Sequence, residues 1–535
     1  MDTKRRSRQV MYPQTKTVPI QPTGGMWRYT EEGEFPPNSS PDMLNCFVYE
    51  GRLCKRPGYS VFPTGMSSLG GQIMGIYATQ DDEYNTHLIA CTAAGVQKYD
   101  FALNLWAALT GPAMAGGDTQ WFTFETSQNS IVFCQGVDKI LRHDISTVAT
   151  TYAVLNANAP ITRYLTRFAD RLFAAYTVET GVTKPFRIRR PVASDHTDWT
   201  GAGSGFSDQT EYPYQLRGIR KLGEGMIAYT ERSIHMAERT GQVLAPYTLR
   251  VKTEGVGLYA ERTLKPLPGS TGHIFMGNDD IYNWNGVQER GVALPIRDYI
   301  FNQVTPSAIR ANFSEVMSDT KEYLLFACQG GSTTPNAVWV FNYGRDIWYP
   351  WSISGPTCAT LCRNDDTTTI DDLVGTIDAQ NWEYDSRLLA SAYPMLITGH
   401  TDGKVYRWGQ QYSGDNGAAI NCYWTSRDLE SDDITTEVPP SRVTLKSLGI
   451  KYKDTGANCT VQLYFSTNGG GSWVGPYSLS LNTTGTPGGN IDAIFDDYQV
   501  TGDRVRFKFV NNTSDESFQI IEFNPVLELR EPIQT

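Results

Sequence analysis

The sequence predicts an all-β protein built around a β-propeller, and three observations lead to this prediction. Among 535 residues, Gly (49), Tyr (29), Phe (22) and Trp (12) are abundant while charged residues make up only 19%. This balance favours aromatic-rich strands joined by glycine turns. Short apolar runs recur at intervals of roughly fifty residues between Cys46 and Gly409, which is typical of propeller blades. Helical periodicity is confined to residues 294–302 and 306–312, which predict short helices between blades.

Each repeating unit pairs a nearly continuous apolar run with an alternating one. In a propeller, the inner strands of a blade lie between neighbouring blades and are apolar on both faces, whereas the outer strands alternate. We count six or seven units; a pair of stacked β-sandwiches is the alternative, because it would also produce short strands at such intervals. The runs are residues 74–78 with 87–91 and 95–99, 130–134 with 136–140, 225–229 with 233–236, 273–276 with 280–284, 322–328 with 338–341, and 395–398 with 403–408.

Composition divides the chain into four segments. Residues 1–44 are rich in proline and lack a sustained period, so they predict an extended N-terminal arm. Residues 45–415 carry the repeats and predict the propeller. Residues 416–440 turn acidic and end in two prolines, which predicts a linker, with a solvated loop as the plainer interpretation. Residues 441–535 contain largely alternating runs separated by Gly and Asn, and predict a C-terminal β-sandwich module.

The formal charge of −11 argues against a protein that grips nucleic acid, because that mode of binding needs a basic surface. Within the repeats, the dense basic cluster is Lys184 with residues 187–190. The charge balance inverts at the N-terminus, where Lys4, Arg5, Arg6 and Arg8 lie close together. We expect these four side chains to contact a neighbouring protein; a frayed, solvated terminus is the alternative.

Patterns of catalytic and metal-binding residues predict a protein that is not an enzyme and that uses no cofactor or metal. Cys358-x-x-x-Cys362 lacks the second half of a zinc site. The six histidines fall mostly in or beside predicted strands, where a structural imidazole is the plainer interpretation. The nine cysteines are scattered, which predicts buried thiols in a cytosol-like compartment. No stretch approaches the roughly 20 apolar residues of a membrane span.

One short motif in the C-terminal module carries a turn signature. Ser466, Asn468, Gly470 and Trp473 resemble the Asp-box of sialidases and other propellers, Ser-x-Asp-x-Gly-x-x-Trp, with Asn in place of Asp. Small polar side chains in such a box satisfy backbone groups of a tight turn, and the Trp packs against it. The motif therefore predicts a structural hairpin, although it also hints at a glycan-active relative.

Several segments taken together resemble the tail nozzle proteins of short-tailed bacteriophages, also described as packaged-DNA stabilisation or tail hub proteins. The opening is Gly51-Arg-Leu-Cys-Lys-Arg-Pro-Gly-Tyr59, which is similar to a short "Gly-x-Leu-x-x-Arg-Pro-Gly" strand that leads into the first blade in that family. Residues 166–175, 217–229 and 254–259 resemble its blade repeats, and the C-terminal module ends near residues 527–530.

The resemblance implies a structural virion protein, located in the tail and assembled in the cytoplasm of a bacterial host. It implies a homo-oligomeric ring, commonly hexameric, beneath the portal and the head-to-tail adaptor ring. Such a ring extends the channel, retains packaged double-stranded DNA and guides its ejection, and a tail fibre, tailspike or needle/plug protein attaches to it. An acidic chain suits such a channel, because basic walls would hold phosphates, so we expect carboxylates to face the lumen.

Two other functions remain open from the sequence. The first is a receptor-binding or glycan-degrading tail component with a sialidase-like propeller, which would need a polar, aromatic-lined pocket. The second is a cellular propeller scaffold, which is disfavoured because the repeats lack Gly-His and Trp-Asp signatures.

Overall fold

The computed structural model describes residues 14–29, 35–146, 148–209, 211–242, 247–363, 394–409, 412–436, 440–455, 459–481 and 489–532. The described chain is an all-β protein, as predicted, and α1 (Arg297–Gln303) is its one α-helix. It forms two compact units: Pro57–Tyr412 is one, and Met1–Arg56 together with Ser413–Thr535 is the other. The first unit is therefore inserted, in sequence, between two halves of the second.

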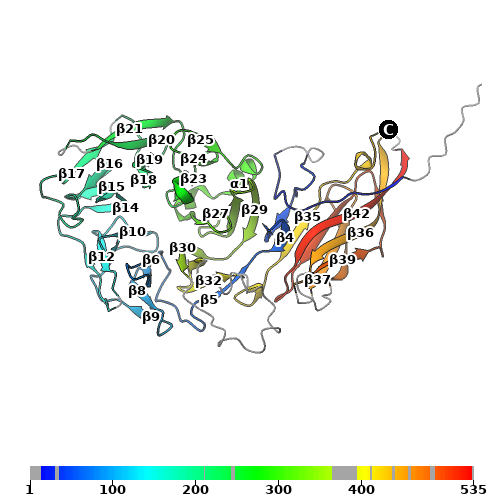
Figure 1. The fold of residues 1–535 in the computed structure, drawn as a ribbon, viewed down its shortest axis with the longest axis horizontal. Helices are drawn as coiled ribbons and strands as arrows, with labels where there is room; N and C mark the ends of the chain where they lie inside the picture. Colours follow the sequence, from blue (N-terminus) through cyan, green and yellow to red (C-terminus); the bar gives the residue numbers. More distant parts are fainter. Residues whose placement is uncertain are drawn as a thin grey trace, which may run out of the picture. The chain divides into compact units, whose positions relative to one another are not determined.

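The unit Pro57–Tyr412 contains seven antiparallel blades of four strands each (Figure 1). Six of them are four-stranded sheets, and the seventh is the part of a six-stranded sheet that lies in this unit. The first three are β6 (Gly75–Gln80), β7 (Thr86–Thr92), β8 (Gly95–Asp100) and β9 (Leu105–Ala108); β10 (Thr123–Ser127), β11 (Ser130–Cys134), β12 (Leu141–Asp144) and β13 (Ala153–Val154); and β14 (Ile161–Phe168), β15 (Arg171–Glu179), β16 (Val182–Arg190) and β17 (Gly205–Asp208).

The remaining blades continue in the same order along the chain. They are β18 (Leu216–Leu222), β19 (Gly225–Thr230), β20 (Ser233–Arg239) and β21 (Tyr247–Glu254); β22 (Lys265–Pro266), β23 (His273–Met276), β24 (Ile281–Trp284) and β25 (Glu289–Gly291); β26 (Phe313–Met317), β27 (Glu322–Ala327), β28 (Ala337–Asn342) and β29 (Ile347–Ser352); and β30 (Pro356–Arg363), β31 (Pro394–His400), β32 (Val405–Gly409) and β5 (Gly58–Val61).

The ring of blades closes on itself through its last sheet. Strand β5 comes from the start of the unit but pairs with β32, with Tyr59 opposite Trp408, and so supplies the outer strand of the seventh blade. Apolar clusters lie between neighbouring blades from the first to the fifth, and another joins the first blade to the seventh through Ile76, Leu88 and Ile397. The fold is a seven-bladed β-propeller, which confirms the prediction of six or seven blades.

The burial of the strands follows the sequence pattern that predicted them. Strands β7, β11, β19 and β27, each the second in its blade, are buried along their whole length, because neighbouring blades cover both faces. One expected run was misplaced: the strand predicted at 136–140 begins at Leu141 instead, after a turn that contains Gly136 with φ +86°. The two predicted short helices are confirmed as α1 and the 3₁₀-helix η3 (Pro306–Ala311).

The second unit is a β-sandwich, as predicted for the C-terminal module. One sheet has the order β3 (Cys46–Tyr49), β4 (Arg52–Lys55), β42 (Gln519–Pro532), β36 (Ser441–Lys453) and β39 (Asn490–Phe495), with β1 (Thr15–Thr17) on β42 and β40 (Val500–Gly502) on β36. The other has the order β2 (Met43–Leu44), β35 (Cys422–Thr425), β41 (Arg506–Asn511), β37 (Cys459–Ser466) and β38 (Val474–Leu481). Trp424 and Phe523 stack between the two sheets, with ring centroids 5.1 Å apart.

The boundaries between the units differ from those expected at 45 and at 416–440. Residues 45–56 belong to the sandwich, because β4 pairs with β42, with Leu53 opposite Ile520. The expected linker contributes β35 to the other sheet and then forms the 3₁₀-helix η6 (Ser431–Asp433). An acidic, proline-bearing stretch can still supply a strand when a partner strand elsewhere in the chain accepts its backbone hydrogen bonds.

The N-terminal arm is extended where the structure describes it, but it lies on its own chain. Strand β1 pairs with β42, with Thr15 opposite Glu528, and β2 pairs with β35, with Met43 opposite Trp424. The described residues of this arm therefore add strands to both sheets of the sandwich. Within the described ranges, no helix is both long and apolar enough to cross a membrane.

Candidate functional site

The Asp-box-like motif forms the turn between β37 and β38. The Ser466 hydroxyl accepts hydrogen bonds from the backbone N–H of Gly470 at 2.9 Å and of Asn468 at 3.3 Å, and donates to Asn468 Oδ1 at 2.8 Å. Asn468 Oδ1 also accepts from the Ser472 N–H at 2.9 Å. Gly470 has φ +87°, and a Cβ there would lie 3.4 Å from the Trp473 ring. The four motif residues therefore act together as a structural turn.

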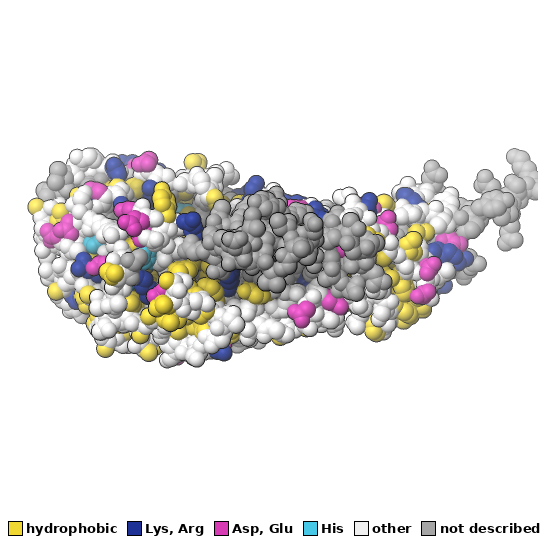
Figure 2. Space-filling model, turned by 60° about the horizontal axis from the view of Figure 1, so that its bottom comes forward, with side chains coloured by type: hydrophobic (Ala, Val, Ile, Leu, Met, Phe, Trp, Pro, Cys, Tyr) yellow, Lys and Arg dark blue, Asp and Glu magenta, His cyan; other side chains and the backbone are white. Residues whose placement is uncertain are grey.

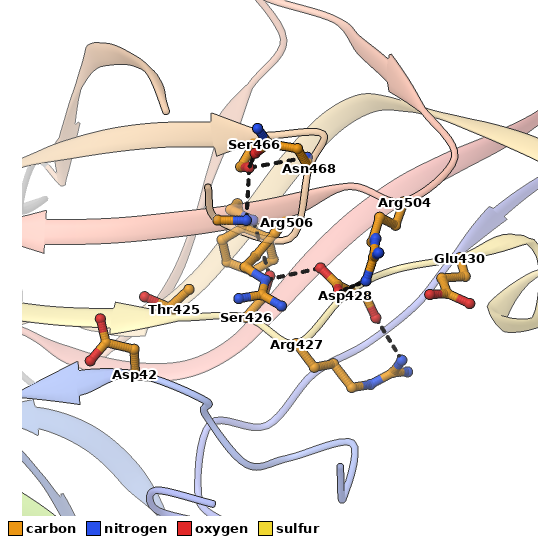
Figure 3. Close-up of polar contacts among 12 residues, drawn as sticks. Asp42, Thr425, Ser426, Arg427, Asp428, Glu430, Ser466, Asn468, Arg504 and Arg506 are labelled. Atoms are coloured by element: carbon orange, nitrogen blue, oxygen red, sulfur yellow. Dashed lines mark hydrogen bonds and ion pairs between the residues drawn. The ribbon is translucent and has the colours of Figure 1, made fainter. Parts of the chain in front are cut away.

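A buried ion pair lies next to this turn (Figure 3). Arg506, opposite Ser466 in the β41–β37 register, donates from Nε to Asp428 Oδ1 at 2.9 Å. Arg504 also points toward Asp428, with Nη1 3.2 Å from Oδ2. The Asp428 side chain is only 2% exposed. Because a buried charge is costly unless it is paired, these contacts stabilise the sandwich.

A second buried ion pair joins the two places where the chain enters and leaves the sandwich. Arg56 precedes the propeller and Asp415 follows it, and their side chains pair in a bidentate manner, with Nη1 to Oδ1 at 2.8 Å. Arg56 Nε also donates to Asn45 Oδ1 at 2.9 Å, and the Arg56 side chain is 1% exposed. Arg56 is the arginine of the Arg-Pro-Gly sequence within the Gly51–Tyr59 segment that carried the family resemblance. Its role in this chain is to fix the crossing segments.

The propeller has a cavity of about 350 Å³ at its centre. The inner strands and adjoining residues of all seven blades line it. Apolar and aromatic lining includes Tyr77, Trp121, Phe122, Phe124 and Tyr164. The charged lining consists of Arg163, Arg220, Arg262, Lys265 and Arg310 with Glu125, Glu261 and Glu315.

Glu261 is the most enclosed of the cavity carboxylates, with a side chain that is 6% exposed. The Tyr164 hydroxyl donates to it at 2.6 Å, and Arg310 Nε lies 3.1 Å from it. Burial and the neighbouring Glu261 charge raise the pKa of Tyr164 well above its usual value, so Tyr164 remains a donor at neutral pH. The other two carboxylates are also paired: Glu315 with Lys265 at 2.8 Å, and Glu125 with Arg220 at 3.9 Å.

Arg262 is held differently, because its guanidinium donates to two backbone carbonyls, those of Ala311 and Thr357. It also lies over the Trp121 ring, 4.1 Å from the centroid. Burial lowers the pKa of Arg262 to about 10, which still leaves it positively charged at neutral pH. The centre of the propeller therefore carries a fixed positive charge.

His273 and the cysteines are buried among their protein partners. His273 accepts from the Tyr229 hydroxyl at Nδ1, 2.8 Å, and donates from Nε2 to the Lys221 carbonyl at 2.9 Å. Burial lowers its pKa to about 4, so the imidazole is neutral. All nine cysteines are free and buried. Among the described residues, no group of three or more His, Cys, Asp or Glu side chains could hold a metal ion.

The structure describes one of the two basic clusters found in the sequence. Lys4, Arg5, Arg6 and Arg8 lie outside the described residues. In the other cluster, Arg187 pairs with Asp208 at 2.7 Å and with Glu179 at 3.4 Å, and its guanidinium lies over the Phe206 ring. On the face drawn in Figure 2, basic and acidic side chains are interspersed without a large field of one sign.

Sequence reasoning did not find the central cavity. Its charged residues come from strands or loops of different blades, so they are spread over nearly 200 positions between Glu125 and Glu315. The inner strands that carry Glu125, Arg163 and Arg220 read TFETS, ITRYLTRF and LRGIRKL, and each holds further polar or charged residues, so these three charges do not stand out in the sequence.

Comparisons with known proteins leave the family open. No protein-family model matches the chain, and no curated protein does. Among solved structures, the extracellular domain of a hybrid two-component system from B. thetaiotaomicron aligns with 74% of this chain at 8% identity and a TM-score of 0.36. The chain spans 43% of the length of that protein.

Proposed function

We propose that this protein is a subunit of the tail nozzle of a short-tailed bacteriophage, where a ring of copies extends the DNA channel below the portal and adaptor. The observation that carries the proposal is the place of the Gly51–Tyr59 segment, on which the family resemblance begins. This segment is the crossing from the sandwich to the propeller, and its Arg56 is buried against Asp415 on the returning chain. The segment is therefore a structural element of a two-unit subunit, as suits a mechanical component.

The acidic balance of the chain supports the same role. A formal charge of −11 over 535 residues disfavours tight binding of phosphates. In the basic cluster of Lys184 and residues 187–190, Arg187 is paired with Asp208 and Glu179. We predict that DNA passes such subunits without specific binding and that carboxylates face the lumen of the assembled ring.

The direct test is the mass of the purified full chain, alone and mixed with its adaptor ring, measured by native mass spectrometry and negative-stain imaging. We expect a hexameric ring, formed alone or on the adaptor. A stable monomer or trimer under both conditions would contradict the proposal.

The basic N-terminal cluster gives a sharper version of this test. Replacing Lys4, Arg5, Arg6 and Arg8 with glutamine should abolish or strongly weaken ring assembly while leaving the circular dichroism spectrum unchanged, because we infer that this cluster contacts a neighbouring subunit or the adaptor. Arg250→Gln together with Arg290→Gln removes two side chains that are 68% and 66% exposed and serves as the charge control. Unimpaired assembly of the four-glutamine variant would refute the role of the cluster.

A second candidate function is a receptor-binding or glycan-degrading tail component. The observation that favours it is the central cavity, which is polar and lined with aromatic rings, as a glycan pocket would be. A screen of the full chain against bacterial surface glycans, read out by binding and by release of reducing ends, distinguishes the two functions. Specific glycan binding or cleavage by a non-hexameric chain would favour the second.

A further inference from the structure

The central cavity of the propeller carries an excess of positive charge within an acidic protein. Five basic and three acidic side chains line it, although the chain as a whole has a formal charge of −11. The net charge of the chain therefore does not account for the excess of basic side chains in the cavity. Cavities that concentrate one sign of charge within walls of low dielectric attract ligands of the opposite sign.

The three carboxylates do not neutralise all five cations. Glu315 is satisfied by Lys265, Glu125 by Arg220, and Glu261 by Arg310 together with the Tyr164 hydroxyl. Each of these carboxylates therefore belongs to a basic partner that also lines the cavity. Two arginines, Arg163 and Arg262, remain after this pairing.

Arg163 and Arg262 are held in place without a carboxylate. Among the described residues, neither guanidinium lies within 4.0 Å of an acidic side chain. Arg163 lies over the Tyr176 ring, 4.1 Å from the centroid. Arg262 lies over Trp121 and donates to two backbone carbonyls, which use only part of its five N–H donors. Both side chains are thus fixed before any ligand arrives, which lowers the entropic cost of binding.

We propose that the central cavity of the propeller binds a compact organic anion through its carboxylate or phosphate group, with Arg163 and Arg262 as the residues that recognise the charge. Guanidinium groups bind carboxylate and phosphate oxygens in pairs of parallel hydrogen bonds, and such bonds are strong where water is partly excluded. The volume of about 350 Å³ suits a molecule of monosaccharide size. Arg310, whose side chain is 45% exposed, marks where the cavity opens to solvent.

This inference is independent of the proposed nozzle function. A propeller in a ring of six and a propeller in a single chain have the same central cavity, because each cavity lies within one chain. Failure to form a ring would leave the anion site untouched, and failure to bind an anion would leave the ring untouched.

The test is isothermal titration of the full chain with inorganic phosphate, with glucuronate and with neutral glucose, at constant ionic strength. We expect saturable binding of phosphate, of glucuronate or of both, and none of glucose. The two anions identify which oxyanion the site prefers. Absence of saturable binding by either anion up to about 10 mM would overturn the proposal.

Variants then locate the site. Arg163→Gln should weaken anion binding about tenfold or more, because it removes one guanidinium and its paired hydrogen bonds. Arg262→Lys keeps the positive charge but loses the paired N–H donors of the guanidinium, and should weaken anion binding less than Arg163→Gln does. Arg250→Gln, on the exposed strand β21, is the matched control and should bind as the native chain does. Circular dichroism and melting temperature establish that each variant is folded. Equal affinity of the folded Arg163→Gln variant and the native chain would place the anion elsewhere and refute the proposal.

Discussion

The propeller and the sandwich of this chain differ in how far apart in sequence their paired strands lie. In the propeller, every blade except the seventh uses four consecutive strands, so its pairings are local in sequence. In the sandwich, Leu53 pairs with Ile520 and Thr15 with Glu528, across more than 450 residues. Local pairings cost less chain entropy to form, and they form faster. We therefore expect that the propeller can fold without the rest of the chain, whereas the sandwich needs strands from both ends of it.

The two units also differ in their titratable groups. All six histidines lie within Pro57–Tyr412. The sandwich has none, and its buried charges include the ion pairs of Asp428 with Arg506 and of Arg56 with Asp415. Acid should therefore weaken the propeller, and removal of one charge should weaken the sandwich.

The largest expected effect comes from deleting residues 1–56. This deletion removes β1 to β4 and leaves β42 and β35 with unpaired backbone groups, so residues 413–535 should lose their fold while the propeller keeps its own. Limited proteolysis with mass spectrometry checks this. A protease-resistant fragment 413–535 from the shortened chain would show that the N-terminal strands are dispensable.

The next effect is the loss of a buried charge in the sandwich. Asp428→Ala removes the carboxylate that pairs with Arg506, whose side chain is 6% exposed, and should lower the free energy of unfolding of the sandwich by about 3–5 kcal/mol. Asp503→Ala removes an acid from an exposed pair with Arg442 and should change it by less than about 1 kcal/mol. Urea denaturation of both variants gives the comparison. Equal losses in the free energy of unfolding for the two variants would show that the buried Asp428 pair is no more stabilising than the exposed Asp503 pair.

Acid should destabilise the propeller more than the sandwich. Burial lowers the pKa of His273 and of His400 to about 4 in the folded chain, below the value of about 6.5 in the unfolded chain. The unfolded chain therefore takes up protons between these values, and propeller stability falls as pH falls through this window. Between pH 7 and pH 5 the loss is about 2 kcal/mol for each of these histidines.

Thermal melts at pH 7 and pH 5 measure this effect, with the sandwich transition as the internal control. His273→Gln should make the propeller transition less sensitive to pH. A sandwich transition that moved as much as the propeller transition would show that the histidines are not the cause.

The smallest effect concerns the Asp-box-like turn. Ser466→Ala removes the acceptor for the N–H groups of Asn468 and Gly470, and should destabilise the sandwich by about 1–2 kcal/mol. Thr467→Ala, at an exposed position of the same turn, is the control and should have almost no effect. Equal melting temperatures for the two variants would show that the Ser466 hydroxyl does not hold the turn.

The sequence was sufficient for the fold because burial follows local pattern. Strands β7 and β27 are apolar along their length since neighbouring blades cover both faces, and that pattern is visible in one run of residues. Pairing partners are not visible in this way. The residues Cys46–Lys55 do not reveal in sequence that they pair with residues beyond 518. The sequence pattern therefore places their strands in the propeller, whereas the structure places them in the sandwich.

The candidate sites also differ in whether their residues are close together in the sequence. The Ser466–Trp473 turn is contiguous, so its hydrogen bonds could be anticipated from the motif. The Arg56–Asp415 pair and the cavity arginines Arg163 and Arg262 come from distant parts of the chain, and only the closed ring and the completed sandwich bring their partners together.

The claim that residues 57–412 form a closed propeller is tested most directly by calorimetry of that fragment beside the full chain. We predict one cooperative transition for the fragment, within about 5 °C of the propeller transition of the full chain. A fragment that starts at residue 63 lacks β5, and should melt at a clearly lower temperature because the seventh blade loses its closing strand. A fragment 57–412 without a cooperative transition, or one that is indifferent to the loss of β5, would contradict the account.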